Sequence, residues 1–154
     1  MPSPEARLSA LGLTLPTPPP AAGAYVPAVR TGNLLYLAGT LPMKDGKPAS
    51  LGKVGREVDL TQAADAARLC ALNALANAKV ALGSLDKVVR VVMVHGFVNG
   101  IDGFSDSPKV LNGASEFLLA VFGDAGKHAR AAVSVNGLPF GVSVEVQMVL
   151  EVRD

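Results

Sequence analysis

The segment VSVEVQMVLEV, residues 142–152, carries an apolar residue at every second position. Successive side chains of a β-strand point to opposite faces, so this alternation predicts a strand with one buried face. Glu145 falls on the other face of this strand, away from the apolar residues. The set predicted to face the core comprises Val142, Val144, Val146, Met148, Leu150 and Val152.

The preceding segment, residues 130–136, predicts another strand of the same sheet. Its apolar set is Ala131, Val133 and Val135, and its other set is Arg130, Ala132, Ser134 and Asn136. If the apolar sets of both strands face the core, Arg130 and Glu145 face the same way. A guanidinium binds carboxylates with two parallel N–H groups, and a nearby carboxylate can move protons through water. The two residues therefore suggest a pocket for a small organic acid, and the alternative is a structural Arg–Glu pair at a sheet surface or subunit contact.

The remaining pattern predicts two long helices and three further strand regions. Asp59 and Gln62 have the spacing of a capping box and open a helix that runs to Leu82, with Gly83 as its end. Ser107 and Pro108 are expected as the N-cap and first residue of a second helix that ends at Gly123. Strands are expected at residues 25–30 and 34–38 as a hairpin, at 88–98 as a central strand, and at 52–58 as a short third strand. The order predicts an α+β sandwich with two helices on one face of a sheet.

The first 23 residues differ in composition from the rest. A short capped helix follows Ser3 and is expected to be peripheral, and the run PTPPP at residues 16–20 is an extended connector. We therefore divide the chain into an N-terminal helix and connector, residues 1–23, and one domain, residues 24–154.

Composition limits the classes of partner. Only 18% of the 154 residues are charged, and 14 basic residues balance 13 acidic ones. No apolar run is long enough for a membrane span, and no basic surface points to nucleic acid as the main partner. The scarcity of charge indicates a surface that another subunit covers. One cysteine and two histidines offer no metal cluster, and without a secretory signal the cytoplasm is the expected location.

Several short motifs stand out along the chain: HARAAVSVNGLP at 128–139, VEV at 144–146, AY at 24–25, GNLLYLAGTLP at 32–42, and FV at 97–98 through DGF at 102–104. These motifs, in the right element order, resemble the Rid family (reactive intermediate deaminase, also called YjgF or endoribonuclease L-PSP). The similarity runs roughly from Ala24 to Val152, and the N-terminal extension and residues 110–126 resemble a longer-chain subgroup.

The resemblance implies a chorismate-mutase-like fold of the bacillary type, a two-layer sandwich of a mixed sheet and two helices, assembled as a homotrimer with clefts between subunits. It also implies roles for particular residues. Arg130 would hold the carboxylate of the substrate, Glu145 would position a water, Tyr25 would line the pocket, and backbone near Gly39 and Ala132 would contact the ligand. The implied reaction is the hydrolysis of small 2-imino or enamine acids to 2-keto acids and ammonia. This chemistry requires no cofactor and no metal.

Two positions depart from the family pattern. Ala132 stands where many members carry cysteine, and Asp102 stands near a position often held by asparagine. An anionic Asp102 beside a substrate carboxylate would oppose its binding unless it points away or is paired. The sequence therefore leaves two alternatives to the deaminase: a non-catalytic protein that binds small acids in the same cleft, and an endoribonuclease, against which the balanced charge argues.

Overall fold

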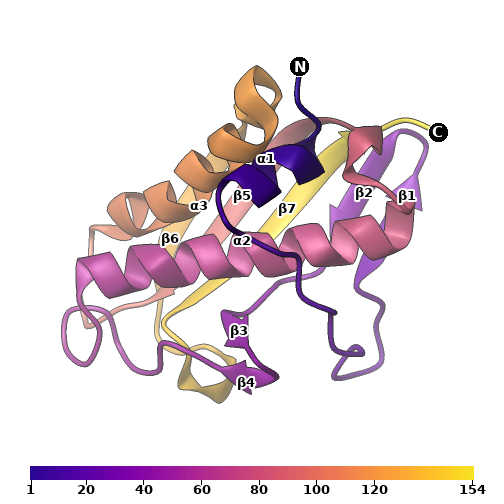
Figure 1. Cartoon of the computed structure of the whole chain (residues 1–154). Helices are drawn as coiled ribbons and strands as arrows, with labels where there is room; N and C mark the ends of the chain where they lie inside the picture. The colour runs from indigo at the N-terminus through magenta and orange to yellow at the C-terminus, as the bar shows by residue number, and fades with distance from the viewer.

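The computed structural model describes residues 1–154 as a five-stranded mixed sheet with helices on one face (Figure 1). The strands lie in the order β1 (Ala28–Thr31), β2 (Leu34–Leu37), β7 (Val144–Val152), β5 (Val88–Asn99) and β6 (Ala129–Val135). Only β5 and β6 are parallel; the other neighbours are antiparallel. The helices are α1 (Pro4–Ala10), α2 (Leu60–Leu82) and α3 (Ser107–Phe122), with short 3₁₀ segments at Leu85–Lys87, Gly123–Gly126 and Pro139–Gly141. The predicted α+β architecture is confirmed.

Helix α2 begins and ends as its sequence predicts. The Asp59 carboxylate accepts a hydrogen bond from the Gln62 N–H at 2.8 Å, and the Gln62 side chain accepts one from the Asp59 N–H at 3.0 Å. This capping box satisfies two of the N–H groups that a helix start leaves free. Gly83 ends the helix in the left-handed conformation, with φ of 83°.

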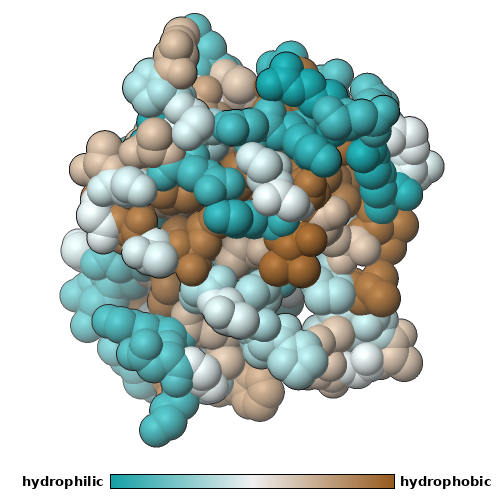
Figure 2. Space-filling model, turned by 45° about the vertical axis from the view of Figure 1, so that its right-hand side comes forward, coloured by the Kyte–Doolittle hydropathy of each residue, from teal (hydrophilic) through white to brown (hydrophobic).

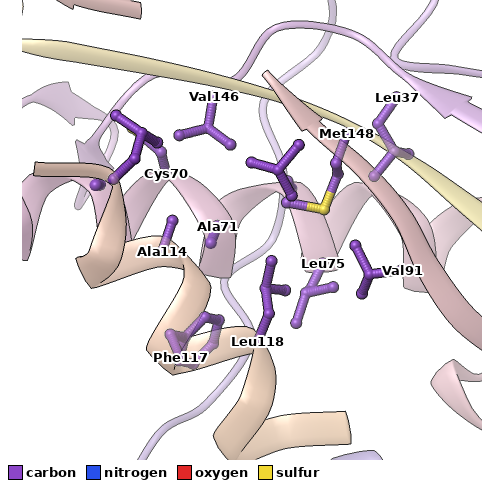
Figure 3. Close-up of a cluster of buried hydrophobic side chains, with 14 of the residues drawn as sticks. Leu37, Cys70, Ala71, Leu75, Val91, Ala114, Phe117, Leu118, Val146 and Met148 are labelled. Carbon is purple, nitrogen blue, oxygen red and sulfur yellow. The ribbon is translucent and has the colours of Figure 1, made fainter. Parts of the chain in front are cut away.

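The core lies between the sheet and the two long helices (Figure 3). The apolar residues of β7 alternate as predicted and are buried, while the residues between them are half-buried on the opposite face. Met148 of β7 packs in this cluster near Leu75 of α2 and Leu118 of α3. Cys70 is fully buried in the same core, and its burial raises the pKa of the thiol, so it serves as a small apolar side chain.

Two glycines determine where α3 lies. A Cβ at Gly96 of β5 would overlap the side chain of Leu111, so α3 rests directly on the sheet there. A Cβ at Gly113 would overlap the backbone carbonyl of Ala64, so α2 and α3 also touch closely. Helices pack this closely only where small residues meet at the crossing. Helix α3 is therefore held by the sheet on one side and by α2 on the other.

Three local predictions are wrong. Residues 52–58 form no strand; the extra strands are instead β3 (Met43–Lys44) and β4 (Lys47–Pro48), paired around the Asp45–Gly46 turn. The 52–58 loop is held by Lys53, whose Nζ donates to Asn99 Oδ1 at 3.0 Å, the Gly100 carbonyl at 3.2 Å and the Asn136 carbonyl at 2.7 Å. Backbone pairing in this loop is limited to isolated bridges of Val54 with Val58 and Gly100, and the Lys53 side chain adds three further hydrogen bonds.

The other two corrections concern helices. Helix α3 begins one residue earlier than predicted: Asp106 is the N-cap and Ser107 the first helical residue, because the Asp106 carbonyl already accepts from the N–H of Val110. Helix α1 is not peripheral. Leu8 is 2% exposed and belongs to the main core, and Glu5 accepts a hydrogen bond from Lys79 of α2 at 2.8 Å. None of the helices is long and apolar enough to cross a membrane.

The close contact at Gly113 predicts the effect of a single methyl group. Gly113→Ala forces the backbones of α2 and α3 apart, and we expect it to lower the free energy of unfolding by about 1–3 kcal/mol in chemical denaturation. The control is Gly137→Ala, because a Cβ at Gly137 would meet nothing within 4 Å. An increase in stability of about 1 kcal/mol for Gly113→Ala, as alanine brings to an unhindered helix, would contradict the contact.

Candidate functional site

Arg130 and Glu145 lie on opposite faces of the sheet. Arg130 of β6 is in register with Val94, and Val94 with Met148, so Arg130 shares the helix-covered face with these two buried residues. Glu145 is in register with Phe97, and Phe97 with Val133, on the open face. No ion pair joins Arg130 to Glu145. The prediction that the two residues face the same way is therefore wrong, and a structural Arg130–Glu145 pair within one chain is excluded.

The reason is the place of β6 in the sheet. It is an edge strand, and its apolar Val133 lies on the open face, 49% exposed, instead of in the core. Ala132, in register with Gly96, lies on the helix-covered face and packs against the core. Alternation identifies the two faces of a strand, but it does not say which of them a helix covers.

The Arg130 guanidinium is held by the first half of α3. Its Nη1 donates to Asn112 Oδ1 at 2.9 Å and to Ser115 Oγ at 3.1 Å, and its Nη2 donates to the Pro108 carbonyl at 3.2 Å. No carboxylate is paired with it. The charge is therefore fixed in place by neutral oxygen atoms and keeps its attraction for an anion.

Three of the five guanidinium N–H groups of Arg130 are used by these acceptors. The remaining two are the Nε–H and one N–H of Nη2. The Nε and Nη2 atoms lie on the same edge of the planar group, an edge that can bind both oxygens of a carboxylate. Sequence reasoning missed Asn112 and Ser115, although polar residues three apart in a helix share one face.

Glu145 lies in different surroundings, on the open face. Its side chain is half-buried and has no hydrogen-bond or ion-pair partner, and this burial raises the pKa of the carboxyl group above its ordinary value of 4.5. Gly39 lies against it: a Cβ at Gly39 would be 2.6 Å from Glu145 Oε1. The backbone beside Gly39 is fixed by two hydrogen bonds between Thr40 and Val146, at 2.8 and 3.0 Å. A carboxyl group with a raised pKa and no partner is suited to proton transfer.

Tyr25 and Gly39 line a cavity of about 320 Å³ beside the N-terminal connector. Tyr25 precedes β1, is 54% exposed, and lies in a bend and not in the predicted strand. Residues 16–22 of the connector form one wall, and Asn73 and Asn77 of α2 form another. Figure 2 turns this side of the molecule toward the reader and shows apolar residues exposed between hydrophilic ones. The connector therefore covers part of a cavity that Gly39 lines, and Glu145 is not among the residues that line it.

Asp102 does not join Arg130 in this chain. It lies in an exposed turn after β5, beyond Asn99, which is in register with Val135 at the far end of β6 from Arg130. No hydrogen bond or ion pair links Asp102 to Arg130. The chain brings together no group of three or more histidine, cysteine, aspartate or glutamate side chains that could hold a metal ion.

Comparison with known proteins agrees with this fold. Residues 5–152 match the family described as "YjgF/chorismate_mutase-like, putative endoribonuclease". The chain belongs to this family. Protein TCP17 of Trypanosoma cruzi is 41% identical over 97% of this chain and 94% of its own length.

Two solved structures are similar to this chain. The protein Atu1372 of Agrobacterium tumefaciens, of unknown function, is 47% identical, with a TM-score of 0.92 over 97% of this chain and 92% of its own. RidA of an Antarctic Psychrobacter is 28% identical, with a TM-score of 0.62 over 88% of this chain and 94% of its own. The Rid family resemblance and its chorismate-mutase-like fold are thereby confirmed.

The raised pKa of Glu145 predicts how stability depends on pH. A carboxyl group with a higher pKa in the folded than in the unfolded chain favours folding while it is protonated, and this contribution is lost as pH rises through the folded-state pKa. Glu145→Gln should therefore be more stable than the wild type at neutral pH, and the difference should shrink below pH 4.5.

Thermal unfolding across this pH range measures the effect, and Glu116→Gln, on the exposed side of α3, controls for the loss of one negative charge. A Glu145→Gln variant that is less stable than the wild type at neutral pH would show that the carboxylate is favourably bound.

Proposed function

We propose that this protein hydrolyses small 2-imino and enamine acids to 2-keto acids and ammonia. The observation that carries the proposal is the Arg130 guanidinium, held by three neutral acceptors and presenting a free Nε–H and Nη2–H edge. Membership of the YjgF family, whose relatives include a RidA, supports the same reaction class. A carboxylate bound on two parallel N–H groups has one orientation, so the carbon next to it is also held.

The reaction needs an oriented substrate, a water molecule and a group that moves a proton. A protonated C=N carbon is electrophilic, so water adds to it once both are held in place. Glu145 accepts a proton from this water as the C–O bond forms and delivers it to nitrogen. The C–N bond then breaks as the new hydroxyl group loses its proton to water and becomes the keto oxygen. The products are a 2-keto acid and ammonia, and the hydrolysis involves no oxidation or reduction. Burial raises the pKa of the Glu145 carboxyl group above its ordinary value, which makes the carboxylate a stronger proton acceptor than an exposed glutamate.

Because Arg130 and Glu145 occupy opposite faces of the sheet, we infer that one active site takes them from two copies of the chain. A homotrimer with a cleft at each contact supplies such pairs. The open sheet face supports this assembly, since it exposes apolar side chains that a second copy would cover. These are Val29, Tyr36, Val92 and Val133, each between 36% and 54% exposed.

The other predicted residues fit at the edges of this cleft. Gly39 leaves room for the Glu145 carboxyl group, and Tyr25 with the connector closes one side of the adjoining cavity. Ala132 follows Arg130 on the same face of β6 and offers backbone groups without a reactive side chain. Asp102 lies in an exposed turn and takes no part in the hydrogen bonds of the guanidinium.

The first test measures turnover of imines generated in solution by an amino-acid oxidase. Arg130→Ala should lower kcat/KM by about 10- to 100-fold, the loss expected for charge-assisted hydrogen bonds, and Arg130→Lys should recover only part of it. The control is Arg153→Ala, because Arg153 bonds only to a backbone carbonyl near the other end of the sheet.

Equal rates for wild type and Arg130→Ala would contradict the proposal. Stabilisation by 2-keto acids with no turnover would assign the protein as a binding protein, and RNA cleavage lost in Arg130→Ala would assign it as a ribonuclease.

The second test uses mixed oligomers. Arg130→Ala and Glu145→Gln chains carrying different tags are co-expressed and purified through both tags. In a cyclic trimer that holds both variants, one cleft in about three receives intact Arg130 and intact Glu145 from neighbouring copies, so about a third of the wild-type activity should return. Each variant alone should show only its own residual activity, well below a third of the wild-type activity. A mixture as inactive as its parents would show that both residues act within one chain.

A further inference from the structure

His128, Ser115 and Arg130 form one chain of hydrogen bonds. His128 Nδ1 lies 2.6 Å from the Gly126 carbonyl, and His128 Nε2 lies 2.9 Å from Ser115 Oγ. Ser115 Oγ in turn lies 3.1 Å from Arg130 Nη1. His128 is therefore connected to the guanidinium through a single hydroxyl group.

The direction of every bond in this chain follows from chemistry. A carbonyl oxygen only accepts, so the hydrogen of the neutral His128 ring is on Nδ1 and is donated to Gly126. Nε2 of the ring then has no hydrogen and accepts the only hydrogen of the Ser115 hydroxyl. The lone pairs of Ser115 Oγ consequently point to Arg130, whose guanidinium can only donate.

The far end of the chain is rigid. A Cβ at Gly126 would overlap the backbone carbonyl of Leu118, so Gly126 packs directly on the backbone of α3. Its carbonyl thus holds the His128 ring from a fixed position relative to Ser115, which belongs to the same helix. A histidine whose tautomer is fixed at one nitrogen orients whatever its other nitrogen binds.

We propose that Ser115 and His128 are positioning residues that hold the Arg130 guanidinium in one orientation, with its Nε–H and Nη2–H edge free for a carboxylate. The identity of the ligand rests on the proposed function, whereas the hydrogen bonds among Ser115, His128 and Arg130 form without any ligand. Asn112 and the Pro108 carbonyl hold other N–H groups, and the Ser115–His128 pair supplies the third contact. An arginine fixed in advance loses less conformational freedom when its ligand binds.

The first experiment observes the arrangement without ligand. At a pH where the ring is neutral, ¹⁵N spectra should show the His128 hydrogen on Nδ1. Rotation about the Arg130 Nε–Cζ bond should accelerate roughly 3- to 10-fold in Ser115→Ala and in His128→Phe, the change expected for the loss of one hydrogen bond. Asn112→Ala, which removes a direct acceptor, gives a reference for the size of the effect. His128→Gln keeps an oxygen that accepts from Ser115 and should restore slow rotation.

The second experiment measures binding of pyruvate by NMR titration, with pyruvamide, which has no carboxylate, as the control ligand. Ser115→Ala and His128→Phe should weaken pyruvate binding roughly 3- to 10-fold and leave pyruvamide unaffected, and His128→Gln should restore pyruvate binding.

Three outcomes separate the claims. Unchanged rotation of Arg130 in Ser115→Ala would overturn the positioning role. Faster rotation with unchanged pyruvate affinity would also overturn it, because the pair would then only fasten β6 to α3. A wild-type protein that binds no pyruvate, but whose Arg130 rotates slowly until Ser115 is removed, would support the positioning role and contradict the proposed function.

Discussion

Helix α3 is wedged between the sheet and α2 at two glycines, and the surroundings of Arg130 depend on that contact. Gly96 allows Leu111 to lie on the sheet, and Gly113 allows α2 to approach from the other side. Asn112 lies between these two contact points and Ser115 shortly after them, so the closest packing in the helix layer positions the oxygens that bind Arg130. Dense packing thus orients a charged group that would otherwise sample many rotamers.

The pleat of the sheet imposes the second constraint. Successive side chains of a strand point to opposite faces of the sheet. In β7, Met148 is therefore on the face opposite to Glu145. Met148 is in register with Val94, and Val94 with Arg130, on the helix-covered face. The sheet therefore lies between Arg130 and Glu145. A site that uses both residues therefore requires two copies of the chain. The low charge of the sequence agrees with this, because exposed apolar side chains such as Tyr36 and Val133 on the open face are suited to contact between copies.

Much of the fold could be predicted from local patterns. The capping box of α2, the left-handed Gly83 and the alternation of β7 each depend on neighbouring residues, and all are confirmed. The start of α3 was wrong by one residue, since local propensity does not fix an exact helix end. The strand expected at 52–58 is absent; this loop makes only isolated bridges at Val54, and Lys53 binds segments more than 40 residues away, contacts that no local pattern indicates.

The candidate site was less predictable, because it depends on contacts between segments that are distant in the sequence. Family motifs identified Arg130 and Glu145, but the alternation of β6 did not reveal which of its faces α3 covers. The contacts of Ser115 with His128 and Arg130 join residues 13 and 15 positions apart on different elements, and no periodic pattern encodes such a meeting. A sequence defines faces and ends of elements, while tertiary packing decides which faces meet.

A crystal structure of the protein with pyruvate bound would test the central claim most directly. The account predicts the carboxylate of pyruvate on the Nε–H and Nη2–H edge of Arg130, with the keto carbon facing Glu145 of a neighbouring copy. Pyruvate bound away from Arg130, or placed between Arg130 and Glu145 of the same chain, would contradict it.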